Sequence, residues 1–206
     1  MRITTFENGP FMVNTYLVVN EETSGAFIID PGSDIRPLLD RIERDGVRLE
    51  AIVNTHGHID HVAGVNLIKK RFEVPLYLNA GDEDMLASVG VQARMFGVGD
   101  PGPIAIDVRL PDSGTVTVAG ITLEVLHTPG HSKGSLSFLI GDTVFTGDAL
   151  FNFSIGRTDL PGGSYAELIE SIRNRLFTLP DATKVLCGHG PATDIGTEKR
   201  LNPFFN

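Results

Sequence analysis

Three histidines and one aspartate lie within six consecutive residues, His56-Gly57-His58-Ile59-Asp60-His61. The chain has six histidines in all, so half of them are concentrated in this one segment. Imidazole and carboxylate groups bind zinc and similar ions, whereas solvated loops are more often built from Ser, Gly, Lys and Glu. The segment therefore predicts a metal or catalytic site.

Histidine or aspartate beside glycine also follows four other apolar segments that are typical of strands. These segments end in Ile29-Asp30-Pro31-Gly32, in Thr128-Pro129-Gly130-His131, in Thr146-Gly147-Asp148 and in Gly188-His189-Gly190. Glycine allows tight backbone conformations, and side chains at strand ends can converge on one edge of a sheet. We therefore expect one site that is assembled from five loops.

The number of candidate ligands favours two metal ions. The seven candidates are His56, His58, Asp60, His61, His131, Asp148 and His189. Three protein ligands and one open position are typical of a catalytic zinc site, so two such sites with one shared carboxylate would use all seven. We assign His56, His58 and His131 to one ion. We assign Asp60, His61 and His189 to the other, with Asp148 as the bridging ligand.

Two divalent ions at this site would support hydrolysis. Such ions would lower the pKa of a bound water, so that it could attack near neutral pH, and would polarise the carbonyl oxygen of the substrate. Zinc is the expected metal, with iron or manganese as alternatives. Asp148 and Asp60 are the predicted catalytic residues, since Asp60 could also hold the hydroxide. Asp30 is placed to accept a hydrogen bond from a ligand imidazole and so orient it.

Alternating strand and helix signals surround these segments. The pattern predicts strands at Arg2–Phe6, Thr15–Asn20, Ala26–Ile29, Ala51–Val53, Val74–Leu78, Thr115–Val118, Ile121–Leu126, Leu136–Ile140, Thr143–Thr146 and Lys184–Leu186. Helices are predicted from a cap at Ser33 or Asp34 to Gly46, from the His-rich segment to Phe72, over Ala80–Val89, and after the cap at Ser164. The glycine- and proline-rich stretch Gly90–Gly114 is expected to be a long ordered loop over the site or a plain connector.

The composition is that of an ordinary globular protein with an acidic surface. The 206 residues are 41% hydrophobic and carry a formal net charge of -9, and we expect a single domain over 1–206. Such a surface repels phosphate backbones, so nucleic acid is not an expected partner. Neither a membrane helix nor a signal peptide is evident, and the lone Cys187 cannot form an internal disulfide. These features favour the cytoplasm, with a small molecule as the substrate.

The order and spacing of the His and Asp segments resemble the successive metal motifs of the metallo-β-lactamase superfamily. This resemblance implies an α/β (α+β) fold, a four-layer αββα sandwich with a two-metal site along one edge. Gly156-Arg157-Thr158-Asp159 and the tail Glu198–Phe204 are similar to the glyoxalase II-like hydrolases, especially the short forms. The resemblance thus implies hydrolysis of a small thioester, with Arg157, Lys199 and Arg200 as candidate substrate-binding residues. The chain ends at Asn206 without the helical region that helps glyoxalase II to hold glutathione.

Three other readings compete with the thioesterase. Persulfide dioxygenases of the same superfamily also carry a Gly-Arg-Thr-Asp segment, and they would bind one iron through His56, His131 and Asp148. A metal-binding module without catalysis is a further alternative. Gly130-His131-Ser132-Lys133-Gly134 matches the G-x-S-x-G pattern of serine hydrolases, but no strand ends at its first glycine and the His-rich segment would be unexplained. His127 and Cys187 are expected to be structural.

Overall fold

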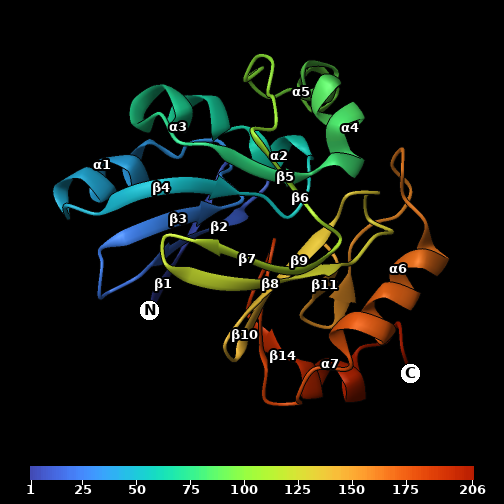
Figure 1. The fold of residues 1–206 in the computed structure, drawn as a ribbon. Helices are drawn as coiled ribbons and strands as arrows, with labels where there is room; N and C mark the ends of the chain where they lie inside the picture. Colours follow the sequence, from blue (N-terminus) through green and yellow to red (C-terminus); the bar gives the residue numbers. More distant parts are fainter.

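The protein is described over residues 1–206 by a computed structural model that contains two six-stranded sheets (Figure 1). The first sheet has the order β1-β2-β3-β4-β5-β6, with β1 Arg2–Asn8, β2 Val13–Val19, β3 Gly25–Ile29, β4 Arg48–Val53, β5 Leu76–Asn79 and β6 Val108–Leu110. The second has the order β14-β13-β10-β9-β8-β7, with β7 Ser113–Val118, β8 Ile121–His127, β9 Leu136–Ile140, β10 Thr143–Gly147, β13 Lys184–Cys187 and β14 Thr193–Asp194. A small hairpin pairs β11 Leu150–Phe151 with β12 Ser154–Ile155.

Helices cover the outer face of each sheet (Figure 1). Above the first sheet lie α1 Arg36–Arg44, α2 Ile59–Val62, α3 Val65–Phe72, α4 Glu83–Ala87 and α5 Val89–Phe96, with a 3₁₀ turn at Ala80–Asp82. Below the second sheet lie α6 Tyr165–Ser171, continued by a π-helical turn at Ile172–Leu176, and α7 Ile195–Leu201. None of these helices combines the length and apolarity that a membrane crossing requires.

Three apolar clusters hold the four layers together. Successive side chains of a strand point to opposite faces, and in β3 Ala26 and Ile28 join the cluster under α1 and α3, while Phe27 and Ile29 join the cluster between the two sheets. A third cluster lies between the second sheet and helices α6 and α7, and it includes Leu168. The predicted αββα sandwich is confirmed.

The directions of the strands explain why the polar segments meet. Strand β3 runs parallel to β4, and β10 runs parallel to β13. Strand β8 is antiparallel to β9, which is antiparallel to β10, so β8 and β10 run in the same direction. The carboxyl ends of the five strands that precede the His and Asp segments are thereby brought to one edge of the sandwich.

Two predicted segments between β5 and β7 differ from the structure. The prediction that Gly90–Gly114 is a loop was wrong at both ends, since α5 extends to Phe96 and β6 covers Val108–Leu110. Packing of Val89 and Ala93 in the core stabilises α5 despite Gly90, and pairing with β5 stabilises β6. The helix predicted over Ala80–Val89 is a 3₁₀ turn followed by α4.

Two other predicted helices also differ from the structure, one by a break and one by its first residue. The helix after the His-rich segment is divided into α2 and α3 at Gly64, where a side chain would collide with the carbonyls of Pro31 and Gly32. Helix α1 is preceded by Ile35 and begins at Arg36, without a side-chain cap from Ser33 or Asp34.

Candidate metal centre

All seven predicted ligands lie together at the carboxyl edge of the two sheets. His56 and His58 lie in the loop after β4, and Asp60 and His61 lie in the short helix α2. The second sheet supplies the other three predicted ligands, which are His131 after β8, Asp148 after β10 and His189 after β13. Each sheet thus contributes part of the centre, and neither could form it alone.

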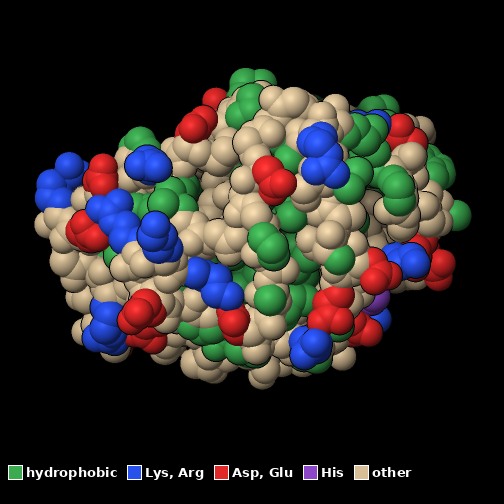
Figure 2. Space-filling model, turned by 90° about the horizontal axis from the view of Figure 1, so that it is seen from above, with side chains coloured by type: hydrophobic (Ala, Val, Ile, Leu, Met, Phe, Trp, Pro, Cys, Tyr) green, Lys and Arg blue, Asp and Glu red, His purple; other side chains and the backbone are tan.

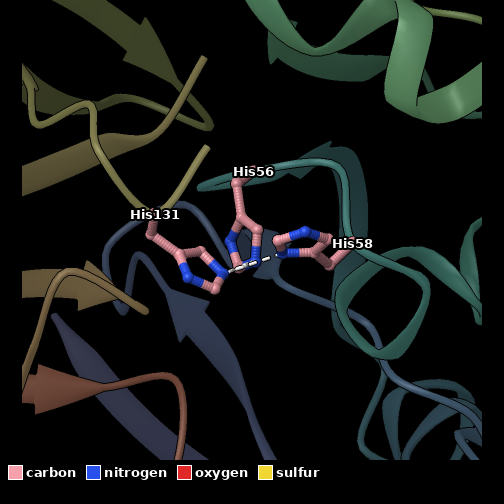
Figure 3. A group of neighbouring side chains, drawn as sticks. All are labelled: His56, His58 and His131. Atoms are coloured by element: carbon pink, nitrogen blue, oxygen red, sulfur yellow. Dashed lines mark hydrogen bonds between the residues drawn. The ribbon is translucent and has the colours of Figure 1, made fainter. Parts of the chain in front are cut away.

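His56, His58 and His131 form the first group of side chains, with their rings directed toward one another (Figure 3). Nε2 of His131 lies 2.8 Å from Nδ1 of His58 and 3.2 Å from Nε2 of His56. All three side chains are buried. Three ring nitrogens converge as they do around a tetrahedral ion with one open position.

Asp60, His61 and His189 form the second group. Nε2 of His189 lies 3.1 Å from Oδ2 of Asp60 and 3.3 Å from Nε2 of His61. His61 is buried, whereas Asp60 and His189 are partly exposed, so solvent can reach this group.

The carboxylate of Asp148 lies between the two groups. Its Oδ1 is 3.3 Å from Nε2 of His61, and its Oδ2 is 3.6 Å from Nε2 of His131 and 3.6 Å from Nε2 of His189. Oδ1 is buried and has no hydrogen-bond partner. A buried oxygen without a donor is costly unless a cation satisfies it, which suits a bridging ligand. Gly188 permits this approach, because a Cβ there would collide with Oδ1 of Asp148.

Hydrogen bonds to the outward ring nitrogens fix the tautomers of three histidines. Nδ1 of His131 donates to the carbonyl of Arg157 at 2.8 Å, and Nδ1 of His189 donates to the carbonyl of Phe11 at 3.0 Å. Nδ1 of His61 lies 3.0 Å from Oδ2 of Asp30. With Nδ1 as the donor, Nε2 in each ring presents a lone pair toward the centre, as a metal ligand must.

His56 is oriented by a chain of two hydrogen bonds. The hydroxyl of Thr55 donates to Oδ2 of Asp30 at 2.6 Å, so its oxygen accepts from Nδ1 of His56 at 3.0 Å. Asp30 therefore orients His61 directly and His56 through Thr55. Ring nitrogens and carboxylate oxygens thus converge on the centre, and this donor set fits divalent metal ions.

The pKa values of the histidines differ between the two groups of predicted ligands. Burial lowers the pKa of His58 to about 3 and that of His56 well below its ordinary value. Burial alone would also lower the pKa of His61, but the carboxylates of Asp148, Asp60 and Asp30 raise it well above its ordinary value. His56 and His58 are therefore neutral before metal binds, whereas the second group holds a proton among carboxylates.

A family comparison agrees with this geometry. Residues 8–189 match the model of the metallo-beta-lactamase superfamily. The chain belongs to this superfamily.

Several known proteins match this chain over nearly its full length. The chain is 40% identical to hydroxyacylglutathione hydrolase GloC of Haemophilus influenzae, over 95% of this chain and 94% of that protein. Among solved structures, TTHA1623 in a di-iron-bound form is 37% identical, with a TM-score of 0.89 over 98% of this chain and 99% of that chain. ETHE1 from Myxococcus xanthus is 31% identical, with a TM-score of 0.84 over 98% and 84%.

Asp82 is a buried aspartate beside the centre that was not predicted from the sequence. Oδ1 of Asp82 accepts from the N–H of Gly134 at 2.7 Å, and Oδ2 accepts from the N–H of Gly57 at 2.9 Å and the hydroxyl of Ser132 at 2.8 Å. Asp82 thus joins the loop of His56 and His58 to the loop of His131. Asp82 is followed by Glu83 and Asp84, and a run of acidic residues is common at the start of a helix, so the sequence does not single out Asp82. Ser132 is buried in this network, which gives it a structural role.

The predicted substrate-binding residues lie outside the cluster of seven. The guanidinium of Arg157 pairs with Asp159 at 2.7 Å, and the backbone carbonyl of Arg157 is the group that reaches His131. Lys199 and Arg200 lie on α7 and pair with Asp181 at 2.7 Å and 3.6 Å. Their contact with substrate stays a prediction.

The two residues expected to be structural have different surroundings. Nε2 of His127 donates to the carbonyl of Lys133 at 2.9 Å, and the residue is partly exposed at the end of β8 rather than packed in the core. Cys187 is buried, and burial raises the pKa of its thiol to about 12. A thiol in that state is a poor nucleophile.

Proposed function

We propose that this protein hydrolyses small thioesters of the hydroxyacylglutathione kind at a centre of two divalent ions, with zinc as the expected metal. The observation that carries the proposal is the pair of three-ligand groups with the carboxylate of Asp148 between them. The similarity to GloC, whose name specifies a hydroxyacylglutathione hydrolase, supports the thioester as the substrate. Divalent ions held there would supply a water of lowered pKa and polarise the substrate carbonyl.

The residues of the centre would have different roles in hydrolysis. His56, His58 and His131 would hold one ion through three ring nitrogens that converge in a buried group. Asp60 is partly exposed beside His189, where its second oxygen can accept a hydrogen bond from the attacking water. A thiolate leaving group needs little help from a general acid, because thiols have a pKa near ~8.5. This suits a centre in which every acidic side chain is occupied as a ligand or a ligand partner.

The test is hydrolysis of lactoylglutathione by protein that has been dialysed against a chelator and then reloaded with zinc, manganese or iron. The proposal requires that the chelated protein is inactive and that reloading restores thioester cleavage. Metal analysis of protein purified without added metal then identifies the natural ion. Full activity after complete metal removal would contradict the proposal.

A persulfide dioxygenase is the second candidate, and one observation favours it. His56, His131 and Asp148 would form its two-histidine, one-carboxylate iron site, and they lie together, with Nε2 of His131 3.2 Å from Nε2 of His56 and 3.6 Å from Oδ2 of Asp148. Such a set leaves positions open for oxygen and substrate. One iron per chain, together with oxygen consumption on glutathione persulfide, would replace the hydrolase by this activity.

A further inference from the structure

A cavity of about 490 Å³ opens directly beside His58 of the metal centre. One wall is formed by the 3₁₀ turn and helices α4 and α5, and the opposite wall by Lys133 and the segment Leu160–Gly162. His58 itself lines the cavity, and Lys133 lies two residues after His131. A group bound in this cavity would therefore be attached to whatever reacts at the first group of ligands, and the volume suits a ligand of small-molecule size.

Apolar side chains form much of the cavity wall, namely Met85, Val91, Met95, Phe96, Leu160 and Pro161. Val91 and Met95 are 58% and 72% exposed, although Val89 and Ala93 of the same helix are buried in the core. Helix α5 thus has a second apolar stripe that no part of the chain covers. Seen from the helix side, charged side chains gather over α1 and α3, whereas hydrophobic ones reach the surface in the half of the molecule that contains α4 and α5 (Figure 2).

The side chain of Gln92 links helix α5 to the segment that follows His58 and to helix α4. Its Oε1 accepts from the N–H of Ile59, the residue after His58, at 3.0 Å, and its Nε2 donates to the carbonyl of Met85 at 3.0 Å. Phe96 packs edge to face against Phe11, with ring centroids 5.6 Å apart. The apolar wall is therefore held in a fixed position relative to the ligands, as a pre-formed binding pocket requires.

The charged groups of the cavity do not favour an anionic ligand. Asp82, Asp84 and Lys133 are its charged side chains, which gives two carboxylates against one ammonium group. The lining residues therefore have no excess of positive charge that would attract a thiol with several carboxylates, such as glutathione. Apolar contact is the interaction that the cavity offers most of.

We infer that this cavity is the binding site for an apolar group of the thioester, and that the preferred substrates carry a longer apolar chain than lactoylglutathione does. The inference rests on the proposed thioesterase activity. The apolar group could belong to the acyl part or to the thiol part of the thioester, since both extend from the reacting carbonyl. Burial of each methylene is worth about fourfold in kcat/KM until the cavity is filled.

Two series of neutral thioesters test this on the metal-loaded protein. One series lengthens the acyl group on N-acetylcysteamine from acetyl to butanoyl, hexanoyl and octanoyl. The other keeps the acetyl group and lengthens the thiol from ethyl to octyl. A rise of kcat/KM along one series supports the inference and identifies the part of the substrate that is bound. If kcat/KM stays level along both series, the cavity is not an apolar subsite.

A polar substitution in the wall gives a second readout. Met95→Gln is expected to lower the octanoyl-to-acetyl ratio of kcat/KM roughly five- to tenfold, because it replaces an apolar surface that contacts the chain. Met95 is exposed, so the substitution leaves no void in the core. Leu201→Gln is the matched control, since Leu201 is a 61% exposed apolar residue on α7 outside the cavity. An equal change of the ratio in both variants would overturn the assignment.

Binding of thioether analogues separates this inference from the proposed reaction. In these analogues a methylene group replaces the carbonyl, so they cannot be hydrolysed, and calorimetry measures their affinity. Tighter binding with chain length in the parent protein, lost in Met95→Gln, supports the cavity even if no thioester is cleaved. Cleavage of short thioesters without any chain-length effect on binding would leave the hydrolase intact and refute the apolar subsite.

Discussion

Oδ2 of Asp30 lies 3.0 Å from Nδ1 of His61, and both side chains are buried. The second oxygen of Asp30 accepts from the N–H of Thr55 at 2.7 Å. One carboxylate therefore fixes the tautomer of a ligand in the second group and holds the chain beside a ligand in the first. Such partners of metal-binding histidines affect metal affinity strongly although they do not touch the metal.

The substitution Asp30→Asn should weaken metal affinity about 10- to 100-fold while the protein remains folded. The amide keeps the shape of the side chain but cannot accept from His61 and Thr55 with both of its polar atoms. Asparagine also tolerates the left-handed conformation at this position, where φ is 50°. Competition with a coloured chelator measures the affinity. Asp34→Asn is the control, because Asp34 is exposed and also has a positive φ of 57°.

Asp148 should be the most sensitive ligand, since it is the side chain that reaches both groups. Asp148→Asn removes the negative charge between them, and we expect the metal content to fall below one ion per chain and hydrolysis to fall at least about 100-fold. His127→Gln alters a histidine that bonds only the carbonyl of Lys133, and it should keep both metal and activity. Elemental analysis and initial rates make the comparison. Equal losses in the two variants would show that the ligand set has been misassigned.

The sequence allowed the candidate ligands to be picked out because their residue types are rare and their positions are regular. His56, His58 and His61 stand out by density alone. His131, Asp148 and His189 are isolated, but each follows an apolar strand beside a glycine, and parallel strand ends meet at one edge of a sheet. That edge is where the structure brings them together.

Features that depend on tertiary packing were not predictable in the same way. The carboxylate of Asp82 joins two loops whose residues are about fifty and twenty-five positions away, and no local pattern distinguishes it from Asp84. Helix α5 contains a glycine and begins beside another short helix, so its local preference for helix is weak. Burial of Val89 and Ala93 against the first sheet stabilises it.

Asp82→Ala should destabilise the fold and the first group of ligands together. It leaves the buried N–H groups of Gly57 and Gly134 without an acceptor, and each such loss costs about 1–3 kcal/mol. We expect a lower free energy of unfolding in the metal-free protein and weaker metal binding by His56, His58 and His131. Asp84→Ala is the control, since Asp84 is exposed and accepts no such bonds. Unchanged denaturant midpoints in Asp82→Ala would contradict the role given to this carboxylate.

The two groups of ligands should lose metal at different pH values. Burial lowers the pKa of His58 to about 3, so at pH 6 this ligand is already neutral and a metal displaces no proton from it. The carboxylates around His61 outweigh burial and raise its pKa well above its ordinary value, so a metal must displace its proton. Acidification therefore opposes binding to the second group, by about tenfold per pH unit for each proton displaced, whereas His56 and His58 carry no proton for a metal to displace.

Dialysis of the fully loaded protein at pH 7.5 and then at pH 5.5 checks this order. The expected result is a fall from two metal ions per chain toward one, with the remaining ion at His56, His58 and His131. His189→Gln, which removes a ligand of the second group alone, should hold one ion at both pH values. His131→Gln should instead lose its single ion on acidification, because only the second group remains. If the pH dependence is the same in both variants, the charge difference between the two groups does not control metal occupancy.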